Sequence, residues 1–372
     1  MDNQYPYTTS PEERAARRAE RVAARRERER RQRRDLLLRL LPAMALGVLV
    51  IGVAIWTLAT QQTPPAEPAD NQQELNVPVE PSEPDPPVPT EVEEPEETIP
   101  PIPTANADTV TMGTELVSEY AVIIDLDTNA ILAQKRPRTV ISPASMTKIL
   151  TLLVACEHIT DESMLDDTIT IDLNITNYTY ANECSVAGFE IGEAVPVREL
   201  LYGTILPSGG EAALGLARYV AGGHDAFVEK MNEKAVELGI SATARFSNCV
   251  GLYDENNVCT VYDMALILMA ALENELAREV LTTKVREIPA NAYHSEGMVL
   301  SNWFLRKIED HVPDGIEVVG AKTGFVDEAG NCAASYAETS DGGRYICVTG
   351  DSTSSWQCIR DHVQLYETYA LQ

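Results

Sequence analysis

A serine and a lysine three residues apart, Ser145 and Lys148, are the side chains of this 372-residue chain best suited to nucleophilic chemistry. Ser142 and Pro143, just before them, predict the start of a helix, with Ser142 as the N-cap and Pro143 as the first helical residue. Apolar residues then recur at helical spacing, at Ile149, Leu152, Leu153 and Cys156. Residues three apart share a helix face, so an amine would lie beside a hydroxyl at the positive end of a helix. Such a pair can act as base and nucleophile.

Two further motifs lie far downstream, Ser208-Gly209-Gly210 and Lys322-Thr323-Gly324. Taken singly, each feature has an ordinary structural explanation: Ser145 as a helix-terminal serine, Lys148 as a solvated charge, Ser208 as a turn residue. The lysine motif alone would be the end of a strand with a glycine turn. The order of the three motifs, their separation and their expected secondary structure are much more specific together. They follow the order found in penicillin-recognising serine enzymes.

Charge is distributed unevenly along the chain. The net charge is -28, but residues 1–34 hold eleven Arg against six Asp or Glu, so this arm carries about +5 and the remainder about -33. A strongly acidic remainder argues against nucleic acid as the main partner. We interpret residues 1–35 as an Arg-rich cytoplasmic arm.

An apolar segment follows the arm. Residues 41–60 carry no charge, and residues 36–38 extend the run up to an interruption at Arg39. About twenty such residues cross a bilayer as a helix. A cleaved signal peptide is the alternative, but its apolar core is usually shorter. We therefore predict an uncleaved transmembrane helix over 36–60, with the Arg-rich arm in the cytoplasm and the remainder outside the cell.

The rest of the chain divides into a linker and a folded domain. Residues 61–111 are rich in Pro and Glu and almost free of aromatics, so they cannot bury a core and should stay extended. Recognition of this Pro-rich segment by a partner is the alternative. Residues 112–372 are long enough for a large core, with strands near both ends and helices between, which predicts an α+β domain. The expected strands are 120–126, 130–134, 316–322, 332–337 and 345–349, and the expected helices are 200–207, 211–220, 227–238, 261–274, 277–283 and 355–370.

Seven Cys follow the apolar segment, and disulfides can form outside the membrane. Spacing alone does not determine their pairing. Cys249 with Cys259 is the first candidate pair, because the two bracket a short polar loop, and Cys347 with Cys358 is the second. Cys156 lies on an apolar helix face and is expected to be a buried thiol. No CxxC motif or closely spaced His/Cys cluster predicts a zinc site.

Longer stretches of the chain resemble the D-alanyl-D-alanine carboxypeptidases, the low-molecular-weight penicillin-binding proteins of the S11 serine peptidase family. The matching stretches are 142–148, 200–203, 231–239 and 322–332. The resemblance covers nearly all of 115–372. It implies the β-lactamase/transpeptidase-like fold, an antiparallel sheet flanked by helices plus an all-helical lobe, with the active site between the two.

The resemblance also implies roles for the catalytic residues. Ser145 would be the acylated nucleophile, and neutral Lys148 would accept its proton. Burial and a second cation, Lys322, both lower the pKa of an amine. Ser208, on the opposite wall, would relay a proton to the leaving D-alanine.

The edge strand that carries the third motif would bind the substrate. Lys322, Thr323 and Gly324 would hold the terminal carboxylate of the substrate. The backbone N–H groups of Ser145 and Phe325 would form the oxyanion hole.

The second motif departs from the family pattern. It usually reads Ser-x-Asn, whereas Gly210 stands here in place of the Asn and Glu211 follows where Asp is common. The missing amide would normally bond to the substrate backbone and to Lys148, and losing such a donor costs about 2–4 kcal/mol at the transition state. We keep Gly210 on the substrate-binding wall. If the missing amide limits turnover, Gly210→Asn should raise activity.

The sequence therefore predicts a membrane-anchored serine D,D-carboxypeptidase that removes the terminal D-alanine from peptidoglycan stem peptides outside the cell. The expected partners are a stem peptide ending in D-Ala-D-Ala, β-lactams as inhibitors, and the membrane through residues 36–60; neither nucleic acid nor any metal or organic cofactor is expected. Two alternatives stay open. One is a non-catalytic muropeptide-binding homologue, which Gly210 favours. The other is a serine β-lactamase on the same scaffold, which would need a deacylating carboxylate such as Glu190 or Glu193.

Overall fold

The structure, a computed structural model, describes residues 102–371. The predicted arm (1–35), the predicted membrane span (36–60) and the linker as far as residue 101 lie outside the described residues. Within the described part of the chain, no helix is both long and apolar enough to cross a bilayer.

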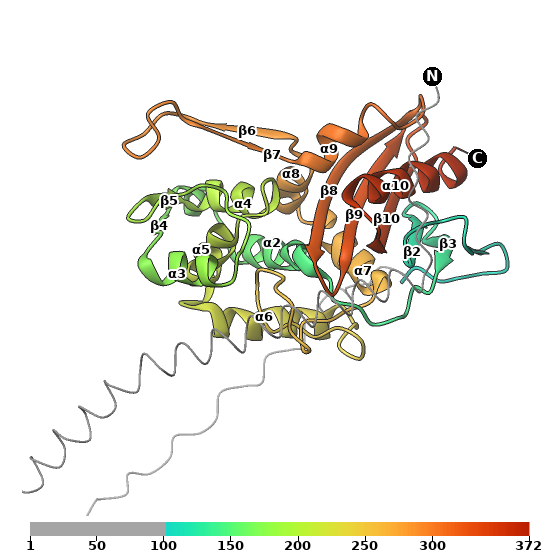
Figure 1. The fold of residues 1–372 in the computed structure, drawn as a ribbon, viewed down its shortest axis with the longest axis horizontal. Coiled ribbons are helices and arrows are strands. Elements are labelled where there is room, and N and C mark those ends of the chain that lie inside the picture. Colours follow the sequence, from blue (N-terminus) through green and yellow to red (C-terminus); the bar gives the residue numbers. More distant parts are fainter. Residues whose placement is uncertain (1–101, 372) are drawn as a thin grey trace, which may run out of the picture. The chain divides into compact units, whose positions relative to one another are not determined.

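A six-stranded sheet within these residues has the order β1-β3-β2-β10-β9-β8 (Figure 1). Its strands are β1 (Val110–Thr111), β2 (Tyr120–Asp125), β3 (Ala130–Lys135), β8 (Ile316–Val326), β9 (Gly330–Thr339) and β10 (Arg344–Ser352). All neighbouring strands are antiparallel except β1, which runs parallel to β3. The hairpin near the start of the domain thus joins the three C-terminal strands through the β2–β10 pair. Strand β8 lies at one edge of the sheet, and no strand within residues 102–371 pairs with its outer side.

The fold begins before residue 112, the predicted boundary. Thr104 forms a bridge with Ala130, and β1 pairs with β3. The hydroxyl of Tyr262 donates to the carbonyl of Pro103 at 2.7 Å. Composition did not reveal this, because these residues are ordered by partners that lie elsewhere in the chain.

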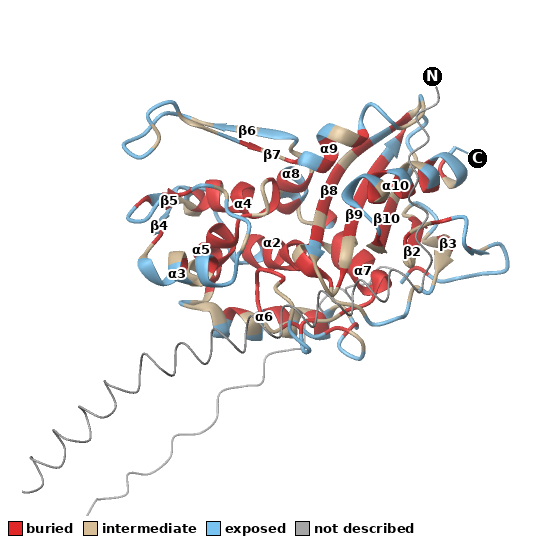
Figure 2. Ribbon diagram, in the orientation of Figure 1, coloured by how far each residue is buried: buried red, intermediate tan, exposed pale blue. Residues whose placement is uncertain are grey.

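Helices cover both faces of the sheet (Figure 1). In β2, Ala121 and Ile123 pack into one apolar cluster while Val122 and Ile124 pack into the other, since successive strand residues point to opposite faces. One face is covered by α9 (Trp303–Ile308) and α10 (Ser355–Tyr369), and the other by α7 (Val261–Glu273) and α8 (Glu275–Thr282). Figure 2 shows buried residues along β8, β9 and β10 between these two layers.

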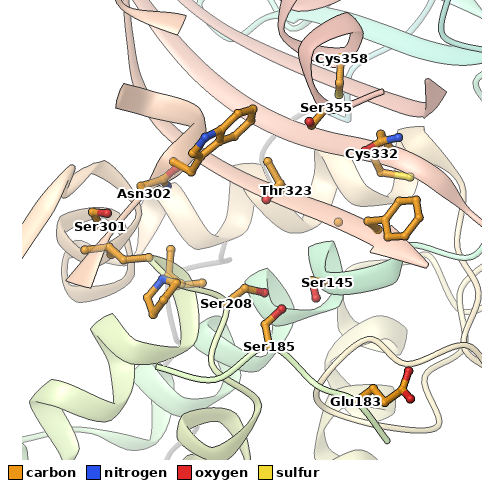
Figure 3. A pocket seen from close by; sticks show the side chains of 17 residues that line it. Ser145, Glu183, Ser185, Ser208, Ser301, Asn302, Thr323, Cys332, Ser355 and Cys358 are labelled. Carbon is orange, nitrogen blue, oxygen red and sulfur yellow. The ribbon is translucent and has the colours of Figure 1, made fainter. Parts of the chain in front are cut away.

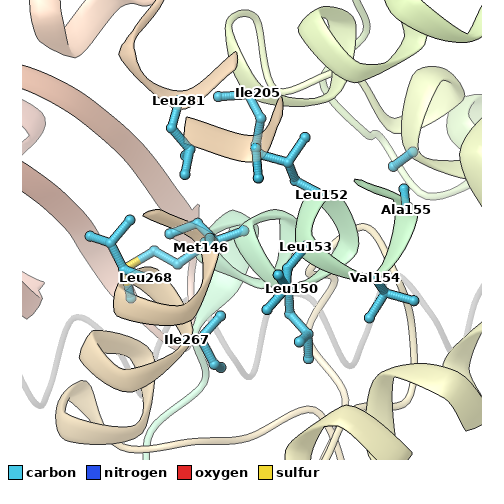
Figure 4. Close-up of a cluster of buried hydrophobic side chains, with 14 of the residues drawn as sticks. Met146, Leu150, Leu152, Leu153, Val154, Ala155, Ile205, Ile267, Leu268 and Leu281 are labelled. Atoms are coloured by element: carbon cyan, nitrogen blue, oxygen red, sulfur yellow. The ribbon is translucent and has the colours of Figure 1, made fainter. Parts of the chain in front are cut away.

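The second half of the domain is a mostly helical lobe built around α2 (Thr147–His158). Every residue from Thr147 to Cys156 is buried, including the expected buried thiol of Cys156 (Figure 4). A helix that is apolar all round must be enclosed by other elements, and α2 contacts five helices. They are α4 (Val197–Ile205), α5 (Gly210–Ala221), α6 (His224–Glu237), α7 and α8. The lobe also contains η2 (Glu162–Asp166), β4 (Thr168–Thr170), α3 (Leu173–Ala181) and β5 (Ala194–Pro196).

A long hairpin of β6 (Val285–Ile288) and β7 (Met298–Ser301) reaches from the sheet side toward the lobe (Figure 1). Its tip is bonded there: the Tyr293 hydroxyl donates to the carbonyl of Gly192 at 2.7 Å, and Nε2 of His294 lies 3.0 Å from the carboxylate of Glu193. Every strand and helix predicted within 120–134 and 200–370 is present, with ends shifted by a few residues. This hairpin, α3 and α9 were not predicted, because their short segments lack a sustained apolar period.

The predicted helix start at Ser142 is wrong. Pro143 is the N-cap of a short 3-10 helix, η1 (Ala144–Met146), and α2 follows directly. The Ser142 hydroxyl is buried and has no hydrogen-bond partner among the described residues. The chain enters the helix through this tighter turn because η1 packs against the edge strand β8.

None of the seven Cys is joined to another by a disulfide bond. The pairs proposed from spacing, Cys249 with Cys259 and Cys347 with Cys358, are therefore wrong. Closeness in sequence does not bring two sulfur atoms within bonding distance, because the direction of each side chain depends on its own element. Six of the seven are buried, and Cys184 is the half-buried exception.

Candidate active site

The hydroxyl of Ser145 and the amine of Lys148 meet where η1 runs into α2. Lys148 Nζ lies 3.2 Å from Ser145 Oγ. The same amine donates to the carbonyl oxygen of Val250 at 2.6 Å, and this second bond aims it at the serine. The two groups are neighbours, as their spacing in the sequence predicts.

The turn that supplies the Val250 carbonyl is organised by Asn248. Its Oδ1 accepts from the backbone N–H groups of Gly251 at 2.7 Å and Leu252 at 2.9 Å, and its Nδ2 donates to the Leu252 carbonyl at 3.1 Å. The position of the Lys148 amine therefore depends on a loop about a hundred residues away, which no motif in the sequence identified.

Burial changes the basicity of Lys148. The side chain is 2% exposed, and the loss of solvation lowers its pKa to about 8, although nearby Cys184, Cys249 and Glu211 oppose part of that shift. Roughly a tenth of the amine is then uncharged at neutral pH. An uncharged amine beside a hydroxyl can accept its proton.

A second buried lysine stands across the site. Lys322 Nζ donates to Ser208 Oγ at 2.9 Å and to the Thr323 carbonyl at 2.8 Å. Burial, and to a lesser degree the charge of Lys148, hold the pKa of Lys322 well below its usual range. Ser208 itself has φ of 66°, a left-handed conformation that is uncommon for a residue with a side chain. This turn between α4 and α5 brings its hydroxyl to the Lys322 amine.

Two glycines allow the backbone to close around Ser145. A Cβ on Gly324 would lie 2.9 Å from the Pro143 carbonyl oxygen and 3.0 Å from the Ser145 nitrogen. A Cβ on Gly251, whose φ is +78°, would lie 2.1 Å from the Ala144 carbonyl oxygen. Neither position has room for a side chain, so edge strand β8 and the Gly251 turn both pack directly on η1.

We expect Gly251→Ala to lower the free energy of unfolding by roughly 2–5 kcal/mol, because it adds a backbone clash to an unfavourable φ. Gly222 is the matched control: its φ is +74° and no atom of the described residues lies within 4 Å of an added Cβ. Gly222→Ala should therefore cost only about 1–2 kcal/mol. Denaturant unfolding of both variants gives the comparison, and equal losses would contradict a tight approach at Gly251.

A cavity of about 410 Å³ opens in front of these groups (Figure 3). The predicted site residues on its wall are Ser145, Ser208, Thr323, Gly324 and Phe325. Lys148 and Lys322 are buried behind that wall and reach it through their bonds to the two serines. The three motifs thus meet in one place, between the sheet edge and the helical lobe.

Gly210, like the two lysines, is a predicted site residue that does not line the cavity. It is buried at the start of α5, and its N–H donates to the Ser185 carbonyl at 2.7 Å. Ser185 itself lines the cavity, as do Asn302 and Trp303 at the start of α9. Sequence reasoning missed these three, because they belong to segments without a motif.

No group of three or more His, Cys, Asp or Glu within residues 102–371 is arranged to hold a metal ion. Glu190 and Glu193, the candidate deacylating carboxylates of a β-lactamase, do not line the cavity. The Glu193 carboxylate is bonded instead to the N–H of Glu190 and to His294 of the hairpin tip. Glu183 is the acidic residue on the cavity wall.

The fold and the site define a protein of the β-lactamase/transpeptidase-like class. The crystal structure of the Streptomyces K15 DD-transpeptidase superposes with a TM-score of 0.61 and 28% sequence identity, over 68% of this chain and 96% of that chain. The family model of the S11 peptidases, described as D-alanyl-D-alanine carboxypeptidase, matches residues 105–353. The chain therefore belongs to the S11 family of serine peptidases.

Two curated relatives are similar along the same region. The D-alanyl-D-alanine carboxypeptidase DacF of Bacillus subtilis is 31% identical over 240 residues, covering 63% of this chain and 58% of the relative. A D-alanyl-D-alanine carboxypeptidase of Streptomyces sp. strain K15 is 31% identical over 233 residues, covering 61% of this chain and 78% of the relative. The match thus spans little more than half the length of the Bacillus protein.

Proposed function

We propose that this protein is a serine D,D-carboxypeptidase that removes the terminal D-alanine from peptidoglycan stem peptides. The observation that carries the proposal is the buried amine of Lys148, 3.2 Å from the hydroxyl of Ser145. Nucleophile and base are in contact before any substrate arrives. The Bacillus and Streptomyces relatives are both named D-alanyl-D-alanine carboxypeptidases, which supports this substrate class.

In the proposed acylation step, Ser145 Oγ attacks the carbonyl carbon of the penultimate D-alanine while Lys148 accepts the hydroxyl proton. The N–H groups of Ser145 and Phe325 stabilise the negative charge that develops on the carbonyl oxygen. The peptide C–N bond then breaks. Ser208 gives its proton to the departing amine and receives the proton that Lys148 had taken from Ser145, so Lys148 is uncharged again. The products are a Ser145 ester and free D-alanine.

Carboxylate binding is assigned to the edge strand. Lys322 and Thr323 bind the terminal carboxylate of the substrate, and Gly324 allows the strand to lie close enough to Ser145. An anion beside Lys322 favours the charged form of its amine, so substrate binding restores the charge that burial disfavours. The empty site therefore does not have to hold two ammonium groups close together.

In the proposed deacylation step, a water attacks the ester carbonyl while Lys148 accepts one of its protons. The ester C–O bond breaks and Ser145 regains its hydroxyl as the shortened peptide leaves. A β-lactam acylates the same oxygen, but its leaving nitrogen stays attached through the opened ring. That group obstructs the incoming water, which is why a long-lived adduct is expected.

The place of action follows from the substrate and the sequence. Peptidoglycan lies outside the cytoplasm, so the cavity must as well. We propose that residues 36–60 anchor the protein as a single membrane span, with residues 1–35 in the cytoplasm and residues 61–111 as an extended linker. The apolar run and the preceding arginines support this arrangement.

The test uses the purified 372-residue chain, a peptide ending in D-Ala-D-Ala and a fluorescent penicillin. We expect release of D-alanine and a stable labelled protein. Peptide binding without release would support the non-catalytic homologue, and rapid turnover of the drug would support the β-lactamase. Either of those outcomes would contradict the carboxypeptidase.

A further inference from the structure

The segment between α3 and β5 lies against the second motif. The Cys184 N–H donates to the Thr179 carbonyl at 2.9 Å, and the Ser185 carbonyl accepts from the Gly210 N–H at 2.7 Å. These bonds join the segment to the end of α3 on one side and to the first residue of α5 on the other. Cys184 and Ser185 are therefore held next to the position where the family places an amide side chain.

The space beside Gly210 is already occupied. A Cβ on Gly210 would lie 2.9 Å from Cys184 Cβ and 3.3 Å from Thr179 Cγ2, and real Cβ atoms essentially never approach as closely as the first of these distances. The expectation that Gly210→Asn raises activity is therefore reversed. The space beside Gly210 is not empty, because Cys184 from another segment occupies it.

Glu211 holds the same segment in place through hydrogen bonds to its backbone. Its side chain is buried, and its Oε1 accepts from the N–H groups of Ala187 at 2.6 Å and Gly188 at 2.8 Å. Two bonds from consecutive backbone amides fix the direction of the chain just after Ser185. Glu211 is thus a positioning residue, which acts on the cavity only through this segment.

Ser185 and Glu183 are the members of the segment that line the cavity, and Ser185 lies beside the two catalytic-motif serines, Ser145 and Ser208. Figure 3 shows its hydroxyl pointing toward the hydroxyls of these two serines. A hydroxyl can both donate and accept, so it can bond to either polar group of a peptide unit.

We propose that Ser185 is a substrate-binding residue that replaces the absent side chain at position 210, with Cys184 filling the space and Glu211 positioning the segment. The ligand group is the backbone amide of the acyl part of a D-Ala-D-Ala peptide, or the amide side chain of a β-lactam. This inference rests on the proposed function, because it names a further contact in the same site. The second motif is then completed by two segments of the chain instead of one.

The first experiment removes the Ser185 hydroxyl. Ser185→Ala should lower kcat/KM for the D-Ala-D-Ala peptide roughly 10-fold, the effect of one hydrogen bond, while Ser185→Thr, which keeps the hydroxyl, should restore most of the rate. Val186→Ala is the matched control, since that neighbouring side chain is 54% exposed and does not line the cavity. The thermal midpoint should not change in any of the three. A Ser185→Ala rate equal to wild type would overturn the proposal.

The second experiment tests whether Cys184 occupies the space beside Gly210. Gly210→Asn alone should lower both the thermal midpoint and the rate of penicillin labelling, because two Cβ atoms collide. Cys184→Gly combined with Gly210→Asn should recover a large part of both, a non-additive result expected only for residues in contact. Additive effects, or a faster Gly210→Asn single variant, would overturn the proposal. The thermal midpoint can be read even if wild type releases no D-alanine, so failure of the proposed function is distinguishable from failure of this inference.

Discussion

Ser145→Ala is expected to abolish covalent labelling by a fluorescent penicillin and to lower kcat/KM for D-alanine release by roughly 10⁴–10⁶-fold. The reason is that the oxygen that forms the acyl bond is gone. The fold should persist, because Lys148 keeps its bond to the Val250 carbonyl and the half-buried serine fills little of the core. The free energy of unfolding should change by less than about 1 kcal/mol.

Ser142→Ala is the matched control for this experiment. Ser142 lies three residues earlier, its hydroxyl has no hydrogen-bond partner in the described part of the chain, and it does not line the cavity. Labelling and turnover should therefore stay at the wild-type level. If the Ser145→Ala protein were still labelled, another residue would be the nucleophile and the proposed mechanism would be wrong.

Lys148→Ala should slow acylation by roughly 10²–10⁴-fold, the usual contribution of a positioned base. The wild-type rate should also depend on pH in a particular direction. The amine accepts a proton only when it is uncharged, and its pKa is lowered to about 8. The rate of penicillin labelling should therefore rise with pH up to about pH 8 and level off above it, and in Lys148→Ala this rise should disappear.

Lys135 offers a matched control for the loss of a partly buried lysine. Its amine donates to the carbonyls of Leu116 at 2.7 Å and Ser118 at 2.8 Å, away from the cavity. Lys135→Ala should cost stability without changing the pH profile of labelling. If the labelling rate of the Lys148→Ala protein still rose with pH up to about pH 8, the base would be a different group.

Secondary structure could be predicted well where the apolar pattern is sustained. The strands near both ends of the domain and the helices α4 to α8 and α10 were expected from periodicity alone, because their buried faces repeat along one segment. The start of the helix at Ser142 and both disulfide pairs were not correctly predicted. The helix start depends on packing against edge strand β8, which is distant in the sequence, and the pairing of two Cys depends on the direction that each element gives its side chain.

The sequence by itself determined the family, the fold class and the closeness of Ser145 to Lys148, since a single helical turn brings this proposed reacting pair together. Only the tertiary structure decided what surrounds them. The Val250 carbonyl that aims the amine, and Cys184 that fills the space beside Gly210, come from loops whose positions follow from packing. The low pKa of Lys148 has the same origin, because burial is a property of the whole enclosure and no local pattern encodes it.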